Sequence, residues 1–154
     1  MIRLQRILLP TDFSNYSAVS TKYACELTER FEAELHLLHA LEIHVDPTPG
    51  FGGGLAIPSY VNESRAAAEK HLADILDPHW AAGRTVIHAV VEGSPRLEII
   101  RYAREQEIDL IVLSTHGRTG LSHIIMGSVA ESVVRTAPCP VLTVRPEGHQ
   151  FVMP

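Results

Sequence analysis

The sequence predicts an α/β fold in which a parallel sheet is covered by helices on both faces. Short apolar runs without alternation recur along the chain, and such runs are typical of strands buried on both faces. Segments with helical spacing of apolar residues lie between these runs. The resulting order, β-α-β-α-β-α-β-α-β, calls for crossover connections and therefore for a parallel sheet.

The first half of the chain contains two strands, one helix and a long irregular stretch. Residues 6–9 (RILL) form an unbroken apolar run that stops at Pro10. We expect a helix over 15–31 and a second strand over 33–41. The stretch 43–62 is rich in proline and glycine and is unusually long for a loop in a compact domain. A functional flap and a tolerated surface insertion both explain it.

The second half continues the alternation and completes a single domain over residues 1–146, followed by a tail over 147–154. The composition shows no second domain and no internal repeat. We expect, in order, a helix over 63–76 capped by Asn62, a strand over 85–91, a helix over 96–105 preceded by Ser94-Pro95, a strand over 109–113, a helix that opens at Gly127-Ser128, and a strand over 140–144.

Composition and charge exclude several classes of function. The net charge of -5 argues against general affinity for nucleic acid or for an anionic membrane. No apolar run approaches the roughly 20 residues that span a bilayer, and the N-terminus does not resemble a signal peptide. Cys25 and Cys139 show neither metal-ligand spacing nor a disulfide framework. These features predict a cytoplasmic protein with buried free thiols.

The loop after the fourth strand has the most distinctive chemistry. Ligands of parallel α/β sheets gather beyond the carboxyl ends of the strands. Here Gly117 and Gly120 allow close backbone approach, and Gly127 precedes Ser128, which opens an S-x-x-E capping box. The first N–H groups of that helix would face the loop, and Arg118 would add a charged contact to a phosphate. The glycines are also explained as turn residues, so the pattern alone leaves anion binding open.

The stretch STHGRTGLSHIIMGSVAESVVRTAPCPVLTVR resembles the C-terminal signature of the universal stress protein family. Nucleotide-binding members of that family carry Gly-x2-Gly-x9-Gly-Ser/Thr. Gly117, nine further residues and then Gly127-Ser128 fit the last two-thirds of this motif, and Ser114 replaces the opening glycine. ILLPTDFS near the N-terminus and EGSP before the third helix resemble other family segments. The resemblance covers residues 6–145 apart from the insertion rich in proline and glycine.

The resemblance implies an open five-stranded parallel sheet in the order 3-2-1-4-5, a Rossmann-like fold of the adenine nucleotide alpha hydrolase type. The order reverses between strands one and four, so Asp12 and the loop 114–120 would face each other across one crevice. The family is usually homodimeric. The strand over 140–144 would be an uncovered apolar edge, and pairing with its two-fold mate would cover it in an isologous interface.

The resemblance also implies an ATP site with Mg²⁺ bound to the phosphate oxygens, largely through water. Asp12 would accept a hydrogen bond from a ribose hydroxyl or the base, and the backbone of Ala40 would meet the adenine edge. The side chain of Ser114 would crowd the phosphate or the ribose, which predicts weakened or retained binding rather than loss. The expected nucleotide-binding residues are Pro10, Thr11, Asp12, Ala40, Gly93, Ser114, Thr115, His116, Gly117, Arg118, Gly120, Gly127, Ser128 and Val129.

Enzymatic activity has little support in the sequence. His116 and His123 flank the phosphate loop, but neither pairs with an orienting carboxylate, so we expect at most slow ATP hydrolysis. His36 and His39 point to opposite faces of a strand and cannot chelate one metal ion together. A phosphoacceptor role like that of receiver domains fails because no second acid accompanies Asp12.

Two hypotheses from different classes follow. The first is an ATP-binding regulatory or stress-response module with unknown protein partners. The second is a dimeric scaffold that binds no nucleotide and acts through protein contacts alone. Gly117, Gly127 and Ser128 favour the first hypothesis, whereas Ser114 favours the second.

Overall fold

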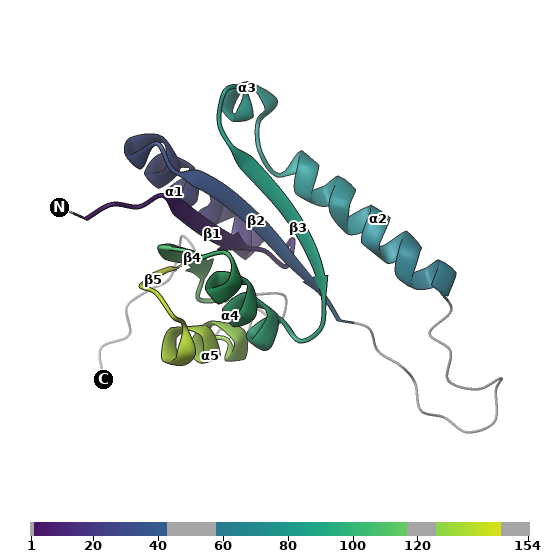
Figure 1. The fold of residues 1–154 in the computed structure, drawn as a ribbon. Coiled ribbons are helices and arrows are strands. Elements are labelled where there is room, and N and C mark those ends of the chain that lie inside the picture. Colours follow the sequence, from purple (N-terminus) through teal and green to yellow (C-terminus); the bar gives the residue numbers. More distant parts are fainter. Residues whose placement is uncertain (1, 43–57, 117–125, 146–154) are drawn as a thin grey trace, which may run out of the picture.

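The computed structural model describes residues 2–42, 58–116 and 126–145, in which one parallel five-stranded sheet runs in the order β3-β2-β1-β4-β5 (Figure 1). Every neighbouring pair of strands is parallel, so the predicted sheet and its order are confirmed. The strands are β1 (Arg6–Pro10), β2 (Glu34–Leu41), β3 (Val86–Glu92), β4 (Leu110–Ser114) and β5 (Val141–Val144). The helices are α1 (Asn15–Phe31), α2 (Pro58–Asp74), α3 (Pro78–Ala81), α4 (Pro95–Glu105) and α5 (Ser128–Thr136).

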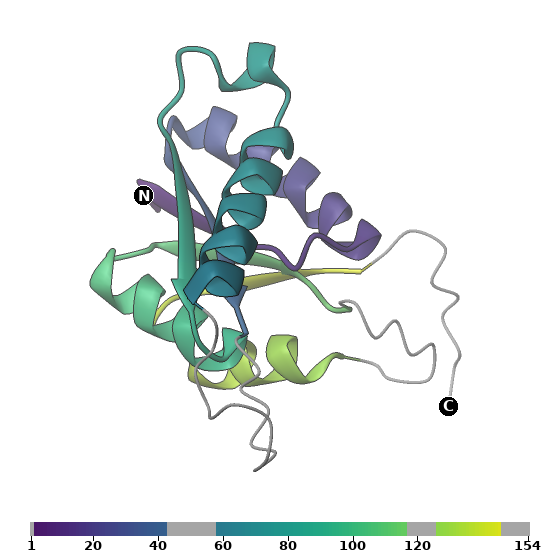
Figure 2. The ribbon, with the colours of Figure 1, turned by 90° about the vertical axis from the view of Figure 1, so that its right-hand side faces the viewer.

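The alternation of side chains along the strands divides the core into two layers. Ile7 and Leu9 of β1 pack in the layer that contains side chains of α1 and α2. Leu8, between them, packs in the layer that contains side chains of α4 and α5. Figures 1 and 2 show these two pairs of helices on opposite sides of the sheet. Both faces are therefore covered, and the apolar runs of the central strands are explained.

The helix before β3 differs from the sequence-based expectation. It begins at Pro58 rather than at residue 63, so Asn62 lies inside α2 and does not cap it. Proline suits the first turn of a helix because its missing N–H has no intrahelical partner there. A second, short helix, α3, follows, and the Asp77 side chain accepts the backbone N–H of His79 at 2.7 Å at its start.

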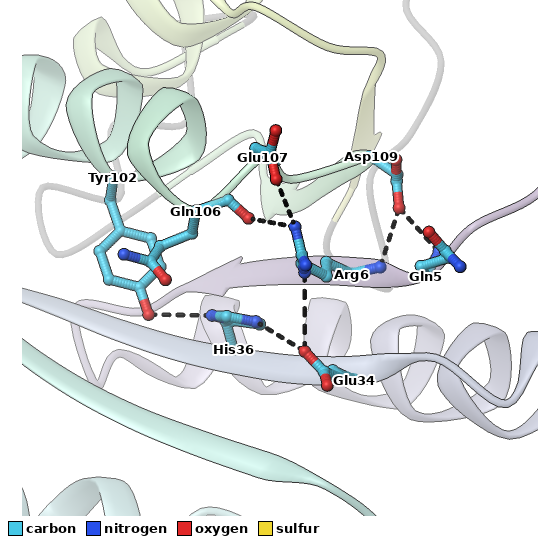
Figure 3. Close-up of polar contacts among 8 residues, drawn as sticks. All are labelled: Gln5, Arg6, Glu34, His36, Tyr102, Gln106, Glu107 and Asp109. Atoms are coloured by element: carbon cyan, nitrogen blue, oxygen red, sulfur yellow. Dashed lines mark hydrogen bonds and ion pairs between the residues drawn. The ribbon is translucent and has the colours of Figure 1, made fainter.

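Polar side chains join β1, β2 and the segment after α4 at the amino edge of the sheet (Figure 3). The Arg6 guanidinium lies 3.1 Å from a carboxylate oxygen of Glu107 and 3.7 Å from one of Glu34. The Asp109 carboxylate accepts the backbone N–H groups of Gln5 and Arg6 at 2.7 and 2.9 Å. This network holds the strand starts on the edge opposite the predicted ligand site.

His36 belongs to the same region but is buried beneath it. Its Nδ1 atom lies 2.9 Å from the hydroxyl oxygen of Tyr102 on α4, and its Nε2 atom lies 3.7 Å from a Glu34 carboxylate oxygen (Figure 3). Burial lowers the pKa of His36 and raises the pKa of Tyr102. His36 faces α4 whereas His39 contacts Phe13 in the opposite layer, so these two histidines do point to opposite faces.

The two cysteines are free thiols and are half-buried. Burial raises the pKa of Cys25 to about 11 and also raises the pKa of Cys139. Among the helices that the structure describes, none is long and apolar enough to cross a membrane.

Candidate functional site

A cavity of about 530 Å³ lies at the carboxyl edge of the sheet, beyond the ends of β1, β2 and β4 and beside the starts of α4 and α5. The strand order reverses between β1 and β4, which is the position where open α/β sheets bind ligands. The volume lies in the range of roughly 300–1,000 Å³ that small-molecule sites occupy. The sequence-predicted residues that line the cavity are Pro10, Thr11, Asp12, Ala40, Ser114, Thr115, His116, Gly127, Ser128 and Val129.

The loop after β1 is held by its own polar groups. Asp12 accepts the backbone N–H of Ser14 at 3.0 Å, and Ser14 is the N-cap residue of α1. Phe13 adopts a left-handed conformation with φ of 63°, which is costly for a bulky residue. Its backbone N–H donates to the Thr11 hydroxyl at 3.0 Å, which stabilises this tight turn. The turn places Asp12 at the cavity.

His39, which lines the cavity at the end of β2, is a residue that the sequence-based site omitted. The side chain is 7% exposed, and its Nδ1 atom lies 2.9 Å from the carbonyl oxygen of Thr11. A carbonyl oxygen only accepts hydrogen bonds, so Nδ1 is protonated and its N–H is the donor of this hydrogen bond. The Phe13 ring stacks on the His39 ring with centroids 4.3 Å apart. His39 therefore fixes the loop after β1 to the end of β2.

The loop after β4 turns its polar side chains inward. The Ser114 hydroxyl accepts the backbone N–H of His116 at 3.4 Å, a long hydrogen bond. The Thr115 hydroxyl lies 2.9 Å from the Nδ1 atom of His116. Thr115 is 3% exposed, and its backbone N–H donates to the carbonyl oxygen of Val144 at 2.9 Å. These hydrogen bonds hold residues 114–116 beside the cavity.

The start of α5 corrects one sequence-based expectation. The N-cap residue is Gly127, and Ser128 is the first helical residue, so the predicted capping box does not begin at Ser128. Gly127 has no side chain that accepts the N–H groups of the first turn, whose positive dipole end meets the cavity. The backbone N–H of Gly127 donates to the Thr115 carbonyl oxygen at 2.7 Å. This arrangement leaves first-turn donors available to an anion.

Four predicted residues stand apart from this arrangement. Gly117, Arg118 and Gly120 lie outside the described residues. Gly93 is described but is not one of the residues that line the cavity. Its φ of 138°, a backbone conformation that L side chains rarely adopt, favours glycine there for structural reasons.

Several lining residues carried little signal in the sequence. Three of them, His39, Leu41 and Glu42, line the cavity because they belong to the carboxyl end of β2 or directly follow it. Tyr60 lies on α2, whose start was not recognised, so no pattern pointed to it. The further lining residues are Ser17, Leu38, Pro95, Ile99, Leu113 and Ala130.

The two ends of the cavity differ in charge. Backbone donors at the start of α5 form one end, whereas Glu42 lies at the other end, beside β2. Asp12 lies at the end of β1, between β2 and β4 in the sheet. Within the described part of the chain, no group of three or more histidine, cysteine or acidic side chains is placed to hold a metal ion. The arrangement suits a ligand that is anionic at one end and neutral at the other.

The chain is similar to proteins of one family along most of its length. The model of the universal stress protein family matches residues 3–145. Universal stress protein MJ0531 of Methanocaldococcus jannaschii is 34% identical over 144 residues, which cover 92% of this chain and 82% of that protein. Universal stress protein YxiE of Bacillus subtilis is 32% identical over 145 residues, covering 91% and 98% of the two chains.

The fold also matches solved structures. Universal stress protein UspA from Lactobacillus plantarum superimposes with a TM-score of 0.77 at 27% identity. The match covers 94% of this chain and all (100%) of that chain.

Proposed function

The chain belongs to the universal stress protein family, and we propose that it is a regulatory module that binds ATP in the cavity at the carboxyl edge of its sheet. One observation carries this proposal. The cavity is lined both by the uncapped start of α5 and by the Asp12 carboxylate. Donors for phosphates and an acceptor for a sugar hydroxyl therefore lie on one ligand-sized surface.

The proposed pose follows the order of the strands. The phosphates lie at Gly127 and Ser128, where backbone N–H groups and the Ser128 hydroxyl donate to their oxygens. The ribose lies over the end of β1, where the Asp12 carboxylate accepts from a hydroxyl group. The base lies over the end of β2, with its edge against the backbone of Ala40. Such a ligand places its negative charge away from Glu42.

Mg²⁺ fits this proposal as a partner of the phosphates. The described residues offer no cluster of protein ligands for a metal ion. Mg²⁺ commonly keeps several waters and binds through substrate phosphates rather than in an all-protein cage. We therefore propose that Mg²⁺ enters with ATP, neutralises the phosphate oxygens, and contacts the chain largely through water.

Two solved proteins with this fold contain related ligands. One is a universal stress protein in complex with cAMP, with a TM-score of 0.67 and 22% identity. Another, from Archaeoglobus fulgidus, is in complex with dAMP, with a TM-score of 0.57 and 20% identity. At these identities the likeness concerns the fold, so the proposal for this chain rests on its own cavity.

In the proposed function, the chain hydrolyses ATP at most slowly. His116 lines the cavity, and its Nδ1 atom lies 2.9 Å from the Thr115 hydroxyl. A hydroxyl partner does not supply the negative charge with which a carboxylate orients a general base. ATP therefore acts as a bound signal whose presence alters contacts with protein partners.

A second function, a dimeric scaffold without nucleotide, is favoured by the hydrogen bond between Ser114 and His116. The Ser114 hydroxyl accepts the backbone N–H of His116, so this N–H donates to Ser114 rather than to a phosphate. β5 is also an edge strand with partly exposed Val141 and Leu142. In both functions we propose a homodimer that pairs β5 with its two-fold mate, because pairing covers this edge.

Calorimetry with ATP and Mg²⁺ separates the two functions. The nucleotide-binding module predicts saturable binding of one ATP per chain, which weakens when Mg²⁺ is removed. A chain that shows no binding at millimolar ATP acts as the scaffold. Native mass spectrometry of the same samples measures the number of nucleotides and of chains in each complex.

A further inference from the structure

We propose that Tyr60 stacks on the base of the bound nucleotide; this inference rests on the proposed function and adds a residue that sets base recognition. Tyr60 lies in the first turn of α2 and lines the cavity. Its side chain is 67% exposed. An aromatic ring that borders a cavity and remains this exposed offers a flat apolar face to a ligand.

The position of α2 places Tyr60 at one end of the cavity. α2 packs against β2 and β3. In the strand order these two strands lie at the opposite end of the sheet from β4 and β5. The start of α5 meets the other end, beyond β4. β2 and β4 are separated by β1, so their ends lie about 10 Å apart, at two strand spacings. Tyr60 is therefore remote from the phosphate donors and close to the end of β2.

The charge at this end selects which part of the ligand lies there. Glu42 follows β2 and lines the cavity with Tyr60. A carboxylate disfavours a phosphate group beside it, whereas a nucleobase is neutral. Leu41 adds an apolar side chain to the same end. A flat, neutral ring is thus the ligand group that this end accommodates.

Stacking gives Tyr60 a defined energetic role. Aromatic side chains that stack on bases contribute about 1–3 kcal/mol per base in alanine substitutions. Stacking tolerates different bases, because each has a π-face, so Tyr60 supplies affinity while the backbone edge at Ala40 supplies the preference for adenine. The phenol hydroxyl takes no part in this contact. Phenylalanine therefore replaces Tyr60 without loss, whereas leucine and alanine do not.

Calorimetry of ATP and ADP binding to Tyr60→Phe, Tyr60→Leu and Tyr60→Ala tests the proposal, with Tyr23→Ala as a matched control. Tyr23 is another exposed tyrosine, 52% exposed on α1, and it does not line the cavity. We expect Tyr60→Phe and Tyr23→Ala to bind within about twofold of the wild type. Tyr60→Ala and Tyr60→Leu should weaken ATP and ADP by the same factor, about 5- to 20-fold, near the lower end of stacking energies.

Each other outcome overturns the inference. Unchanged affinity in Tyr60→Ala shows that the ring makes no contact, and a loss in Tyr60→Phe equal to that in Tyr60→Ala shows that the hydroxyl matters. A different loss for ATP than for ADP places Tyr60 at the phosphates. If the wild-type chain binds neither nucleotide, the proposed function fails and the inference fails with it, whereas wild-type binding with an unaffected Tyr60→Ala variant refutes the inference alone.

Discussion

The backbone N–H of Gly127 donates to the carbonyl oxygen of Thr115 at 2.7 Å, and this bond joins the start of α5 to the end of β4. It fixes the direction of the first turn of α5 relative to the sheet. The cavity therefore has a rigid end whose backbone donors are preorganised.

Replacement of Ser114 by glycine should strengthen ATP binding. The Ser114 hydroxyl accepts the N–H of His116, and its removal takes away an acceptor that competes with the ligand for that donor. One additional hydrogen bond is worth about 0.5–1.5 kcal/mol, so we expect a gain of roughly two- to tenfold in affinity. Ser114→Ala is the control, because it also removes the hydroxyl but keeps the Cβ. Weaker binding by Ser114→Gly would show that the hydroxyl itself contacts the nucleotide.

Asp12→Asn should weaken ATP binding while the fold is retained. The asparagine side-chain oxygen still accepts the N–H of Ser14, so the start of α1 keeps this contact. The charged acceptor for the ribose hydroxyl is lost, and a charged hydrogen bond exceeds a neutral one by about 1 kcal/mol. Calorimetry should show a loss of about fivefold.

Asp109→Asn is the matched control for Asp12→Asn. Asp109 accepts two backbone N–H groups at the opposite edge of the sheet and does not line the cavity. It should lower the free energy of unfolding and leave ATP affinity unchanged. Equal affinity losses in the two variants would indicate a general effect of charge rather than a ribose contact.

His36 should make the stability of the protein depend on pH. Its pKa in the folded state is lowered from 6.5 by burial, so the unfolded chain binds the proton more readily. The contribution of neutral His36 to the free energy of unfolding is complete above pH 6.5. It is lost as the pH falls through the folded-state pKa of His36. Urea unfolding at pH 7 and pH 5 should show that the free energy of unfolding decreases less on acidification for His36→Gln than for the wild type.

His88→Gln is the control for the unfolding experiment, because His88 is exposed on β3. It should retain the wild-type decrease in the free energy of unfolding. An identical decrease in His36→Gln and the wild type would assign the pH dependence to other groups.

Thr143→Pro should dissociate the proposed homodimer. The carbonyl oxygens of Pro140 and Val144 accept the N–H groups of Ile111 in β4 and of Thr115 after it, so Thr143 directs its N–H away from β4. Proline removes this outward donor once in each protomer. Two bonds of about 1 kcal/mol each predict a dimer weakened about 30-fold. Sedimentation should detect this loss, whereas Thr143→Val, which keeps the N–H, should sediment as the wild type.

The order of elements was predictable because the local patterns and the sheet agree. The apolar run at Ile7–Leu9 has no polar alternation, and the structure shows it buried between two helical layers. The start of α2 was missed because Pro58 resembles a continuation of the preceding segment rich in proline and glycine. Helix propensity describes the interior of a helix better than its first turn.

The candidate site was predictable where its residues come directly after strands. Asp12 and Thr115 follow β1 and β4, and the parallel sheet brings both to one edge. His39 lies near the end of the predicted strand 33–41, but no pattern distinguished it from its neighbours, and Tyr60 required the position of α2, which no local pattern contains. The predicted cap at Ser128 failed by one residue, because serine is also accommodated at the first helical position.

Calorimetry of ATP binding to Gly127→Val tests the central claim most directly. Gly127 has φ of -67°, which suits any residue, and an added Cβ would lie 3.4 Å from the Thr115 carbonyl oxygen. The backbone at Gly127 therefore accommodates a Cβ, and we expect the methyl groups of valine to occupy the space of the phosphates. We predict saturable ATP binding by the wild type, weaker binding by Gly127→Ala, and none by Gly127→Val with the fold retained. Wild-type affinity in Gly127→Val would contradict the account.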